Sequence, residues 1–298
     1  MDECVLAIDF THESMTTAFV FPDGRLIGEA GLALDKFSAY GDVPQAEKLV
    51  AMLANKMKSR PAPVKSAIFS LVGELDSGRT AVLSHPGAPW LNAFPLRDAA
   101  AAALGLPVLL RRRSLLLLSY DVGMLALPDD ALTVGCYVDL HYDNAIWYRG
   151  GPLLGRSRAS GNISHLTIHG REDFCFCGRS GCVDLYGAGI RLRQIHRMIF
   201  PDTPIENIFI QLGDHPILQD YLSMMAYPIA MEVSILDPDF VVLGGGILAM
   251  QDFPRRRLEE EIIRQSYIPG GRTVVFLPSA TDAVGGLACA GRYAFPRE

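Results

Sequence analysis

The sequence predicts an α/β fold made of two lobes. Short apolar runs that end in turn signals alternate with segments of helical spacing, and the order of strand, hairpin and helix occurs in two successive rounds. A natural break lies between the rounds, near residues 119–131. Each round supplies its own strands and covering helices, which favours two packed lobes. We expect these lobes over residues 1–118 and 119–298, with the final helix near 283–298 packing back on the first lobe.

The first lobe is expected to open with antiparallel strands. Val5–Asp9 is one apolar run and Thr17–Phe21 is another, and Pro22-Asp23-Gly24 follows as a turn signal. Helices and strands then alternate over Val43–Met57, Ala67–Val72, Arg97–Leu104, Pro107–Leu110 and Ser114–Met124. Serine caps helix N-termini well, so we expect Ser114 to be the N-cap of the last helix.

The second lobe repeats this order. Leu132–Val138 and Asn144–Tyr148 resemble a hairpin. A long helix, expected to bend at Pro228, has an apolar face of seven residues: Ile217, Leu218, Tyr221, Leu222, Met225, Ile229 and Val233. The closing elements are a strand, a helix, a strand and a helix, over Phe240–Leu243, Arg255–Gln265, Thr273–Phe276 and Ala283–Tyr293.

Composition narrows the class of protein. The chain has 298 residues, 49% of them hydrophobic and 20% charged, as in an ordinary globular protein. Its net charge of −6 gives no global attraction to nucleic acid or to an anionic membrane. No secretory signal and no apolar stretch of about 20 residues is present. We therefore expect a soluble cytoplasmic protein without a nucleic-acid or membrane partner.

A loop after the second hairpin carries three thiols and an imidazole. His165 is followed by Cys175, Cys177 and Cys182, with glycines that permit tight turns between the cysteines. Zinc favours four nitrogen or sulfur ligands in a tetrahedron, and a set of three cysteines and one histidine leaves no open position. The loop over residues 165–182 therefore predicts a structural zinc site.

Two other interpretations of these cysteines stay open. They are ordinary buried thiols, or Cys175 and Cys182 form a disulfide. Three cysteines within eight residues are unusual for a core, and a disulfide would leave Cys177 without a partner. Zinc is the interpretation that uses all four side chains.

Around this loop the chain resembles the ROK family of sugar kinases and sugar-responsive repressors. Gly161–His165 matches the family's Gly-Glu-x-Gly-His, and residues 175–184 match Cys-x-Cys-Gly-x-x-Gly-Cys-x-Glu, with Asn162 and Asp184 in place of the two glutamates. Residues 237–246 and 283–288 match as well, and residues 119–122 and 251–254 look like bacterial allose kinases. The resemblance implies the two-lobed, actin-like hexokinase fold (a duplicated ribonuclease H-like fold), zinc on the histidine and three cysteines, and a homodimer or homotetramer.

In this family two loops, Asp-x-Gly-x-Thr and Gly-Thr-Gly-x-Gly, hold the phosphates of ATP. Here the first reads Asp9-Phe-Thr11-His-Glu13 and the second reads Asp139-Leu-His-Tyr-Asp143. Asp9 is retained as a candidate nucleotide contact, although it also fits a capped strand end. Each new carboxylate about 4 Å from a phosphate costs roughly 4 kcal/mol. These changes argue against ATP and magnesium as cofactors of this chain.

The family's general base is missing. Kinases of the family carry Asn-Asp after the strand at Pro107–Leu110, and that aspartate takes the proton of the attacking sugar hydroxyl. The resemblance places Arg112 and Arg113 at this pair, and arginine cannot accept a proton. Asp121 is the nearby carboxylate, but helical spacing puts it two turns further along. We assign no catalytic residue.

The sugar contacts implied by the resemblance are partly retained. Gly87 replaces the asparagine of a Pro-Asn-x-Pro turn, and Asn162 and Asp184 replace glutamates. His165 is kept, as a zinc ligand at least. These four residues are the candidate contacts for a sugar or sugar phosphate.

Two further segments allow two interpretations each. Gly244, Gly245 and Gly246 follow a strand at the place where the family holds adenosine, or they form an ordinary tight turn. Residues 111–113 recruit an anion such as a sugar phosphate, or they form a solvated basic patch at a helix start.

Three functions follow from the resemblance and its departures. The first is a pseudokinase, stabilised by zinc, that senses a ligand or binds a partner. The second is an active ATP-dependent hexose kinase of allose kinase type. The third is an accessory transcriptional regulator that does not bind DNA, because the first strand begins by residue 5 and leaves no room for the added DNA-binding domain of the family's repressors. The three losses at the phosphate loops and the base favour the first.

Overall fold

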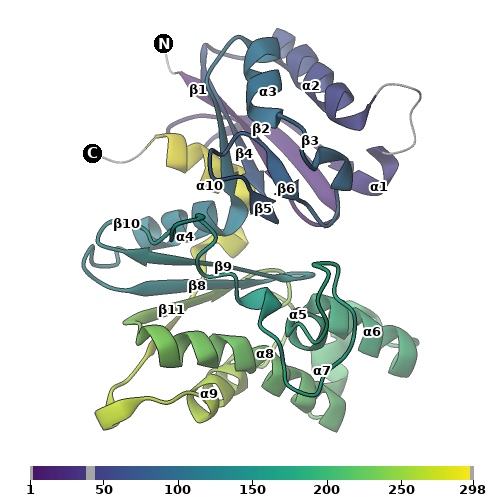
Figure 1. The fold of residues 1–298 in the computed structure, drawn as a ribbon, viewed down its shortest axis with the longest axis vertical. Helices are drawn as coiled ribbons and strands as arrows, with labels where there is room; N and C mark the ends of the chain where they lie inside the picture. The colour runs from purple at the N-terminus through teal and green to yellow at the C-terminus, as the bar shows by residue number, and fades with distance from the viewer. Residues whose placement is uncertain (1–2, 38–43, 296–298) are drawn as a thin grey trace. The chain divides into compact units, whose positions relative to one another are not determined.

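The computed structural model describes residues 3–37 and 44–295, which divide into two compact units. The first unit contains the described residues of 1–120, 155–159 and 283–298, and the second contains residues 121–154 and 160–282. Sheets and helices are present in both units, which confirms the predicted α/β class (Figure 1).

The first unit is built on a mixed five-stranded sheet in the order β3-β2-β1-β4-β7. Its strands are β1 (Cys4–Phe10), β2 (Ser14–Val20), β3 (Leu26–Ala33), β4 (Val64–Leu71) and β7 (Val108–Arg112). The first three strands are antiparallel neighbours, because tight turns join them, whereas β4 and β7 run parallel to β1. At the predicted turn, the Gly24 N–H donates to the Phe21 carbonyl at 2.9 Å, and Gly24 has a φ of +89°.

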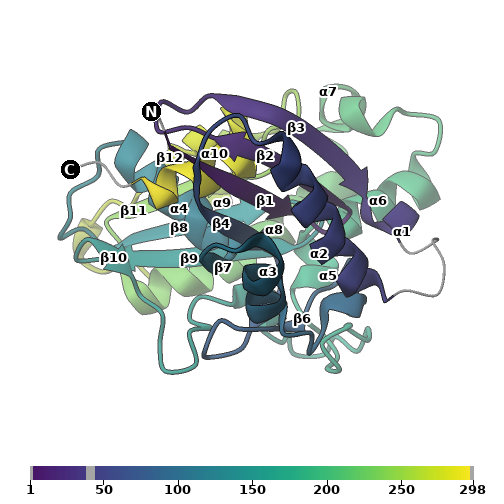
Figure 2. The same ribbon diagram turned by 90° about the horizontal axis from the view of Figure 1, so that it is seen from above.

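Helices cover both faces of this sheet. The helices of this unit are α1 (Leu34–Phe37), α2 (Gln45–Lys56), α3 (Leu96–Leu104), the first part of α4 (Arg113–Met124) and α10 (Gly285–Ala294). A small hairpin of β5 (Glu74–Leu75) and β6 (Val82–Ser84) lies in the same unit. Figures 1 and 2 show α2 and α3 on one face of the sheet and α10 on the other. Side chains alternate along β1, so Ile8 joins the core beneath α2 and α3 while Asp9 faces α10.

The second unit is built on another five-stranded sheet, in the order β10-β9-β8-β11-β12. Its strands are β8 (Thr133–Val138), β9 (Tyr142–Tyr148), β10 (Gly151–Pro152), β11 (Phe240–Gly244) and β12 (Val275–Pro278). β8 and β9 form the predicted antiparallel hairpin, and β11 runs parallel to both β8 and β12. β11, which lies between β8 and β12, ends at Gly244, where the glycine turn begins.

One face of the second sheet is covered by long helices (Figure 1). The helices of this unit are α5 (Asp184–Gly187), α6 (Gly189–Ile199), α7 (Ile208–Leu212), α8 (Pro216–Leu236) and α9 (Arg255–Gln265). The apolar face predicted for the long helix lies in the core, where Leu218, Leu222 and Ile229 are fully buried. Within the described residues, no helix combines the length and apolar character needed to cross a bilayer.

Most predicted elements are present, and several begin or end at other residues than predicted. Ser114 is not an N-cap, because β7 passes into α4 without a loop and the helix begins at Arg113. The last strand lies two residues later than predicted, since its register pairs Phe240 with Val275 and Leu243 with Pro278. The helices α5, α6 and α7 were not predicted. Val43, the predicted start of the second helix, lies outside the described residues.

A buried histidine shapes the turn that carries Gly87. His85 is 2% exposed, and its Nδ1 accepts hydrogen bonds from the N–H groups of Gly87 and Ala88, at 3.2 and 2.9 Å. Its ring lies edge-on to Phe10, with 5.6 Å between the ring centres. Burial lowers the pKa of His85 from its ordinary value of 6.5 to about 4. The folded turn therefore holds a neutral imidazole.

This burial predicts a pH-dependent stability of the first unit. Between the two pKa values the unfolded chain binds a proton that the folded chain does not, so stability falls as the pH drops from 6.5 to 4, by about 3 kcal/mol in total. Urea unfolding followed by Trp90 fluorescence in a Trp147→Phe background measures this unit. His85→Gln should remove most of the slope in that window, and an equal slope in both proteins would contradict the assignment.

Candidate functional site

The four predicted metal ligands lie together in the second unit. His165 ends a short 3₁₀ turn, Ile163–His165, and the three cysteines lie on the loop that follows. One ligand atom from each residue lies within 4.8 Å of the other three. Cys175 Sγ is 3.7 Å from His165 Nδ1, and Cys177 Sγ is 3.6 Å from Cys182 Sγ. All six cysteines of the chain are free, so the alternative disulfide is absent.

Backbone turns bring these ligands together. The Cys175 N–H donates to the Arg179 carbonyl at 2.7 Å, and the Gly178 N–H donates to the Cys175 carbonyl at 2.9 Å. Gly181 has a φ of +73°, and a Cβ there would lie 2.4 Å from the Arg171 carbonyl oxygen. The second glycine is therefore required by both its backbone angle and its close contact.

The donor set and its spacing fit zinc. With zinc–sulfur bonds of about 2.3 Å, the edges of a tetrahedron of ligands are about 3.8 Å long. The two ligand distances of 3.7 and 3.6 Å are close to that edge. These four residues would hold the ion, and a closed set of this kind supplies folding stability rather than a place for substrate.

Asp9 lies in a buried cluster of the first unit. Its side chain is 6% exposed, and it accepts a hydrogen bond from the Ser70 hydroxyl. Arg113 Nε lies 3.3 Å from Asp9 Oδ1 and 3.5 Å from Oδ2. Gly286 of α10 packs so closely that a Cβ there would lie 2.2 Å from Asp9 Oδ2. The structure thus pairs the predicted nucleotide residue with the residue at the predicted base position.

The arginines at the end of β7 and the start of α4 have partners within the protein. Arg113 is 13% exposed and pairs with Asp9, so it is not part of a solvated patch. Arg111 lies over the ring of Tyr293, 5.4 Å from its centre, and its Nε donates to the Tyr293 hydroxyl at 3.2 Å. These contacts join α4 to β1 and β7 to α10 within the first unit.

The glycine turn after β11 is capped by carboxylates of the same unit. The Gly246 N–H donates to Asp139 Oδ1 at 2.5 Å, and the Gly245 N–H donates to Asp282 Oδ1 at 3.0 Å. Backbone N–H groups of such turns are the donors that hold phosphates. Here the N–H groups of Gly245 and Gly246 already donate to the carboxylates of Asp282 and Asp139.

Close packing also explains why this turn contains glycine. A Cβ on Gly244 would lie 2.4 Å from Ser279 Cβ, and one on Gly245 would lie 2.6 Å from the Val138 nitrogen. Gly245 also has a φ of +99°. Gly244 and Gly245 are therefore accounted for by the turn itself, whether or not a ligand approaches it.

Asp184, a candidate sugar contact, is fully buried. His141 Nδ1 hydrogen-bonds one of its oxygens, and the Tyr142 N–H donates to the other at 2.9 Å. Both oxygens of this carboxylate are therefore engaged inside the protein. His141, a residue of the same unit, is therefore the hydrogen-bond partner at the position where a sugar contact was predicted.

The other candidate sugar contacts have separate surroundings. Asn162 is half-buried, and its Oδ1 accepts a hydrogen bond from the Ser164 hydroxyl at 2.8 Å. Gly87 belongs to the first unit, where a Cβ would lie 1.7 Å from the His12 carbonyl oxygen. Asn162, His165 and Asp184 belong to the second unit.

Asp121 is locked in the core of the second unit. It is fully buried and accepts hydrogen bonds from the Tyr137 hydroxyl, the Ser279 hydroxyl and the Ala280 N–H, at 2.7, 2.8 and 2.7 Å. Burial raises the pKa of Asp121, and the three hydrogen bonds oppose that rise. Its oxygens join α4 to the segment after β12.

Sequence reasoning missed the partners of these groups. Ser70 is 61 residues from Asp9, His141 is 43 residues from Asp184, and Asp282 is 37 residues from Gly245. No local spacing links residues so far apart. The first pair is explained by the parallel register of β1 and β4, which places Asp9 opposite Ser70.

Comparisons with known proteins agree with this fold. An N-acetyl-D-glucosamine kinase of Escherichia coli is 27% identical over 134 residues, which cover 39% of this chain and 44% of that kinase. The match therefore spans less than half the length of that relative. A ROK family glucokinase from Streptomyces griseus, solved with glucose and AMPPNP, superposes with a TM-score of 0.78 at 18% identity, covering 97% of this chain and 98% of the glucokinase.

A ROK family transcriptional regulator, a homologue of the E. coli MLC protein, also has a TM-score of 0.78 at 18% identity. The superposition covers 99% of this chain and 78% of the regulator. These likenesses confirm the predicted actin-like hexokinase fold. The sequence model of the ROK family matches residues 43–288. The chain therefore belongs to the ROK family and is a homologue of its sugar kinases.

Proposed function

We propose that this ROK protein has lost phosphoryl transfer and acts as a zinc-stabilised protein that senses a ligand or binds a partner. One observation carries the proposal. Arg113, at the position where the family resemblance puts the general base, forms a buried ion pair with Asp9, the one residue retained from the first phosphate loop. Each of the two groups is thus engaged by the other.

The Arg113–Asp9 ion pair can stabilise the fold, but it cannot serve proton transfer. Arginine stays protonated in proteins, so Arg113 cannot take a proton from a sugar hydroxyl. Asp9 is held by both Arg113 and Ser70, which stabilise its charged form. Asp121, the alternative base, is enclosed by three donors of the second unit.

The glycine turn supports the same proposal. Phosphate binding at Gly245 and Gly246 would have to displace the carboxylates of Asp282 and Asp139 from their N–H groups. Those carboxylates would then face the phosphates as like charges, at roughly 4 kcal/mol for each contact of about 4 Å. Phosphate oxygens are therefore poor ligands for the N–H groups of Gly245 and Gly246.

An active ATP-dependent hexose kinase is the second candidate. Its support is that the relatives include an N-acetyl-D-glucosamine kinase and a glucokinase solved with glucose and AMPPNP. Allose would be its substrate by the resemblance in residues 119–122 and 251–254. A regulator that does not contact DNA is the third candidate, and its support is limited to the fold shared with a ROK family transcriptional regulator.

Turnover decides between the first two candidates. We expect zinc-loaded protein, supplied with ATP, magnesium and a panel of hexoses that includes allose and N-acetylglucosamine, to release no ADP above the rate without sugar. The E. coli N-acetyl-D-glucosamine kinase, assayed in parallel, is the positive control. Hexose-dependent ADP release at an ordinary kinase rate would refute the proposed loss of transfer.

The ion pair makes a separate prediction about stability. Arg113→Met leaves the Asp9 charge buried without its partner and should destabilise the first unit by about 3–5 kcal/mol. Asp9→Asn combined with Arg113→Met should recover most of this loss, since no charge is then left buried. Urea unfolding followed by Trp90 fluorescence measures both. A double variant as unstable as the single variant would mean that packing, not charge, holds this cluster.

Metal content tests the proposed zinc site. Freshly purified protein should contain about one zinc ion per chain, because the four residues form one closed ligand set. Cys177→Ser should lower the zinc content and the urea stability of the second unit, measured by Trp147 fluorescence. Cys289→Ala, which removes a thiol in the first unit, is the matched control and should keep its zinc. Zinc-free wild-type protein of full stability would contradict the site.

A further inference from the structure

A buried carboxylate on α8 begins a chain of hydrogen bonds that leads to the zinc loop. Glu232 is 4% exposed, and the other buried residues of α8 are uncharged. Its Oε1 accepts a hydrogen bond from Asn144 Nδ2 on β9 at 3.0 Å. Asn144 is 2% exposed, and its Oδ1 accepts a hydrogen bond from the Ile163 N–H at 3.3 Å. Ile163 begins the 3₁₀ turn that ends at His165, and we call Glu232, Asn144 and Ile163 the relay.

The two hydrogen bonds give the amide of Asn144 a single orientation. A backbone N–H only donates and an ionised carboxylate only accepts, whereas a side-chain amide has one group of each kind. The amide oxygen therefore faces Ile163, and the amide NH₂ group faces Glu232. Cys136 Sγ on β8 lies 3.7 Å from the other carboxylate oxygen, Oε2. Because the carboxylate accepts from the NH₂ group, it prevents the amide from turning its oxygen away from the turn.

The relay meets the backbone at a tight turn. Asn162 has φ −83° and ψ 77°, and the Ile163 N–H also donates to the Gly161 carbonyl at 3.0 Å, as in an inverse γ-turn. Gly161 has a φ of +79°, and a Cβ there would lie 3.1 Å from Asn144 Nδ2. Asn144 therefore contacts both ends of this turn. The chain continues directly into His165, so the turn sets where the imidazole leaves the backbone.

The histidine differs from the cysteines in what holds it. The cysteines lie on the loop, whose own backbone hydrogen bonds bring them together. His165 belongs to the 3₁₀ turn, which packs against β9 and α8. From the loop it receives one hydrogen bond, from Arg179 Nη2 to its carbonyl oxygen at 2.9 Å. The placement of the imidazole thus depends on contacts outside the loop.

We propose that Glu232 and Asn144 are positioning residues for the zinc ion, which act through the turn before His165 to hold its imidazole in place for the metal. Groups that orient a zinc ligand contribute to metal affinity although they do not touch the ion. The inference rests on the proposed zinc site, and it is independent of whether the chain transfers phosphate.

Zinc release from the full chain tests this role. Glu232→Leu keeps a side chain of similar length in the core but removes the acceptor of the Asn144 amide. Zinc should pass from this variant to an excess of the coloured chelator 4-(2-pyridylazo)resorcinol about tenfold faster than from the wild type. Glu232→Gln keeps an acceptor oxygen for the amide and should release zinc at the wild-type rate.

Exchanging the two groups gives a stricter test. Asn144→Asp places a second carboxylate against Glu232, and this variant should also release zinc faster, since like charges repel. Asn144→Asp combined with Glu232→Gln reverses the amide and the carboxylate. The new carboxylate can then accept from both the Ile163 N–H and the new amide, so the double variant should recover the slow release. A double variant as fast as Asn144→Asp alone contradicts the relay.

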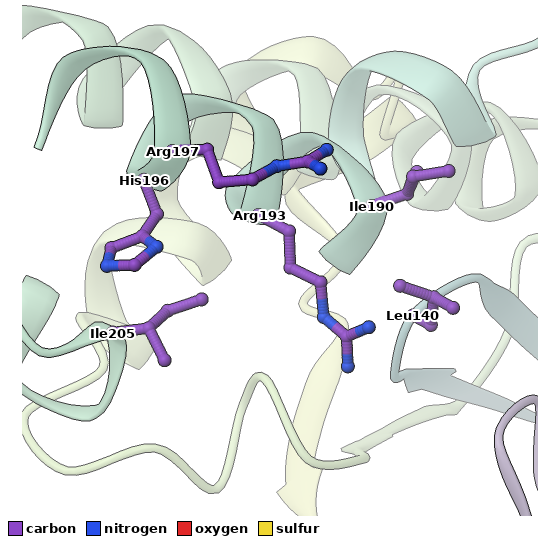
Figure 3. A pocket seen from close by; sticks show the side chains of 6 residues that line it. All are labelled: Leu140, Ile190, Arg193, His196, Arg197 and Ile205. Carbon is purple, nitrogen blue, oxygen red and sulfur yellow. The ribbon is translucent and has the colours of Figure 1, made fainter. Parts of the chain in front are cut away.

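Two control variants separate the relay from general stability. Leu258→Ala removes a fully buried side chain of α9 from the core of the same unit. It should lower the urea midpoint but release zinc at the wild-type rate in the absence of urea. Arg197→Gln changes a polar side chain of the same unit away from the relay, and it should alter neither quantity. Arg197 lines a cavity of about 460 Å³ beside α6, together with Leu140, Ile190, Arg193, His196 and Ile205 (Figure 3).

The possible failures are distinguishable. Wild-type protein that contains no zinc when freshly purified refutes the zinc site, and the positioning role falls with it. Zinc-containing wild type with an unchanged release rate in Glu232→Leu overturns the positioning role alone. Equal acceleration by Leu258→Ala would also overturn it, because loss of stability would then explain the release. If Glu232→Leu does not fold, the exchanged pair at positions 144 and 232 decides.

Discussion

The structure depends on one electrostatic constraint: a carboxylate that the fold buries must find its donors inside the protein. An unpaired buried charge costs several kcal/mol, which is a large part of the stability of a domain. Four buried carboxylates are found among the described residues, and each has internal donors: Asp9 with Ser70 and Arg113, Asp121 with Tyr137, Ser279 and Ala280, Asp184 with His141 and Tyr142, and Glu232 with Asn144 and Cys136. These pairs hold strands and helices of each unit together.

This constraint also bears on chemistry. In a phosphotransferase of this fold, carboxylates and backbone N–H groups have to face the reactants, the first to take a proton and the second to hold phosphate oxygens. In this chain the same kinds of group face one another. Arg113 engages Asp9, and Asp139 and Asp282 engage the N–H groups of the glycine turn. Groups that satisfy each other add to stability and are less available to a ligand.

The loop with the four candidate metal ligands and the cavity beside α6 differ in how far apart their residues lie in the sequence. The ligands of the loop lie within 18 residues, so tight turns alone bring them together, and the glycine at 181 is there because of a close backbone contact. The cavity joins Leu140, α6 and Ile205, which are far apart in the sequence. In the sequence, Arg193 and Arg197 look like part of an ordinary polar helix face. Only the structure shows that they line a cavity together with residues of other segments.

The sequence by itself determined the α/β class, most of the strands and helices, the family and the four clustered metal-ligand candidates. Periodicity and turn residues act over a few positions, and the zinc motif is equally local, so one-dimensional patterns are enough to predict them. Tertiary structure alone decided which charges are paired. Asp9 meets Ser70 through the parallel register of β1 and β4, and Arg113 meets Asp9 because β7 passes into α4 without a loop. Contacts between residues so distant along the chain depend on packing, which local patterns do not carry.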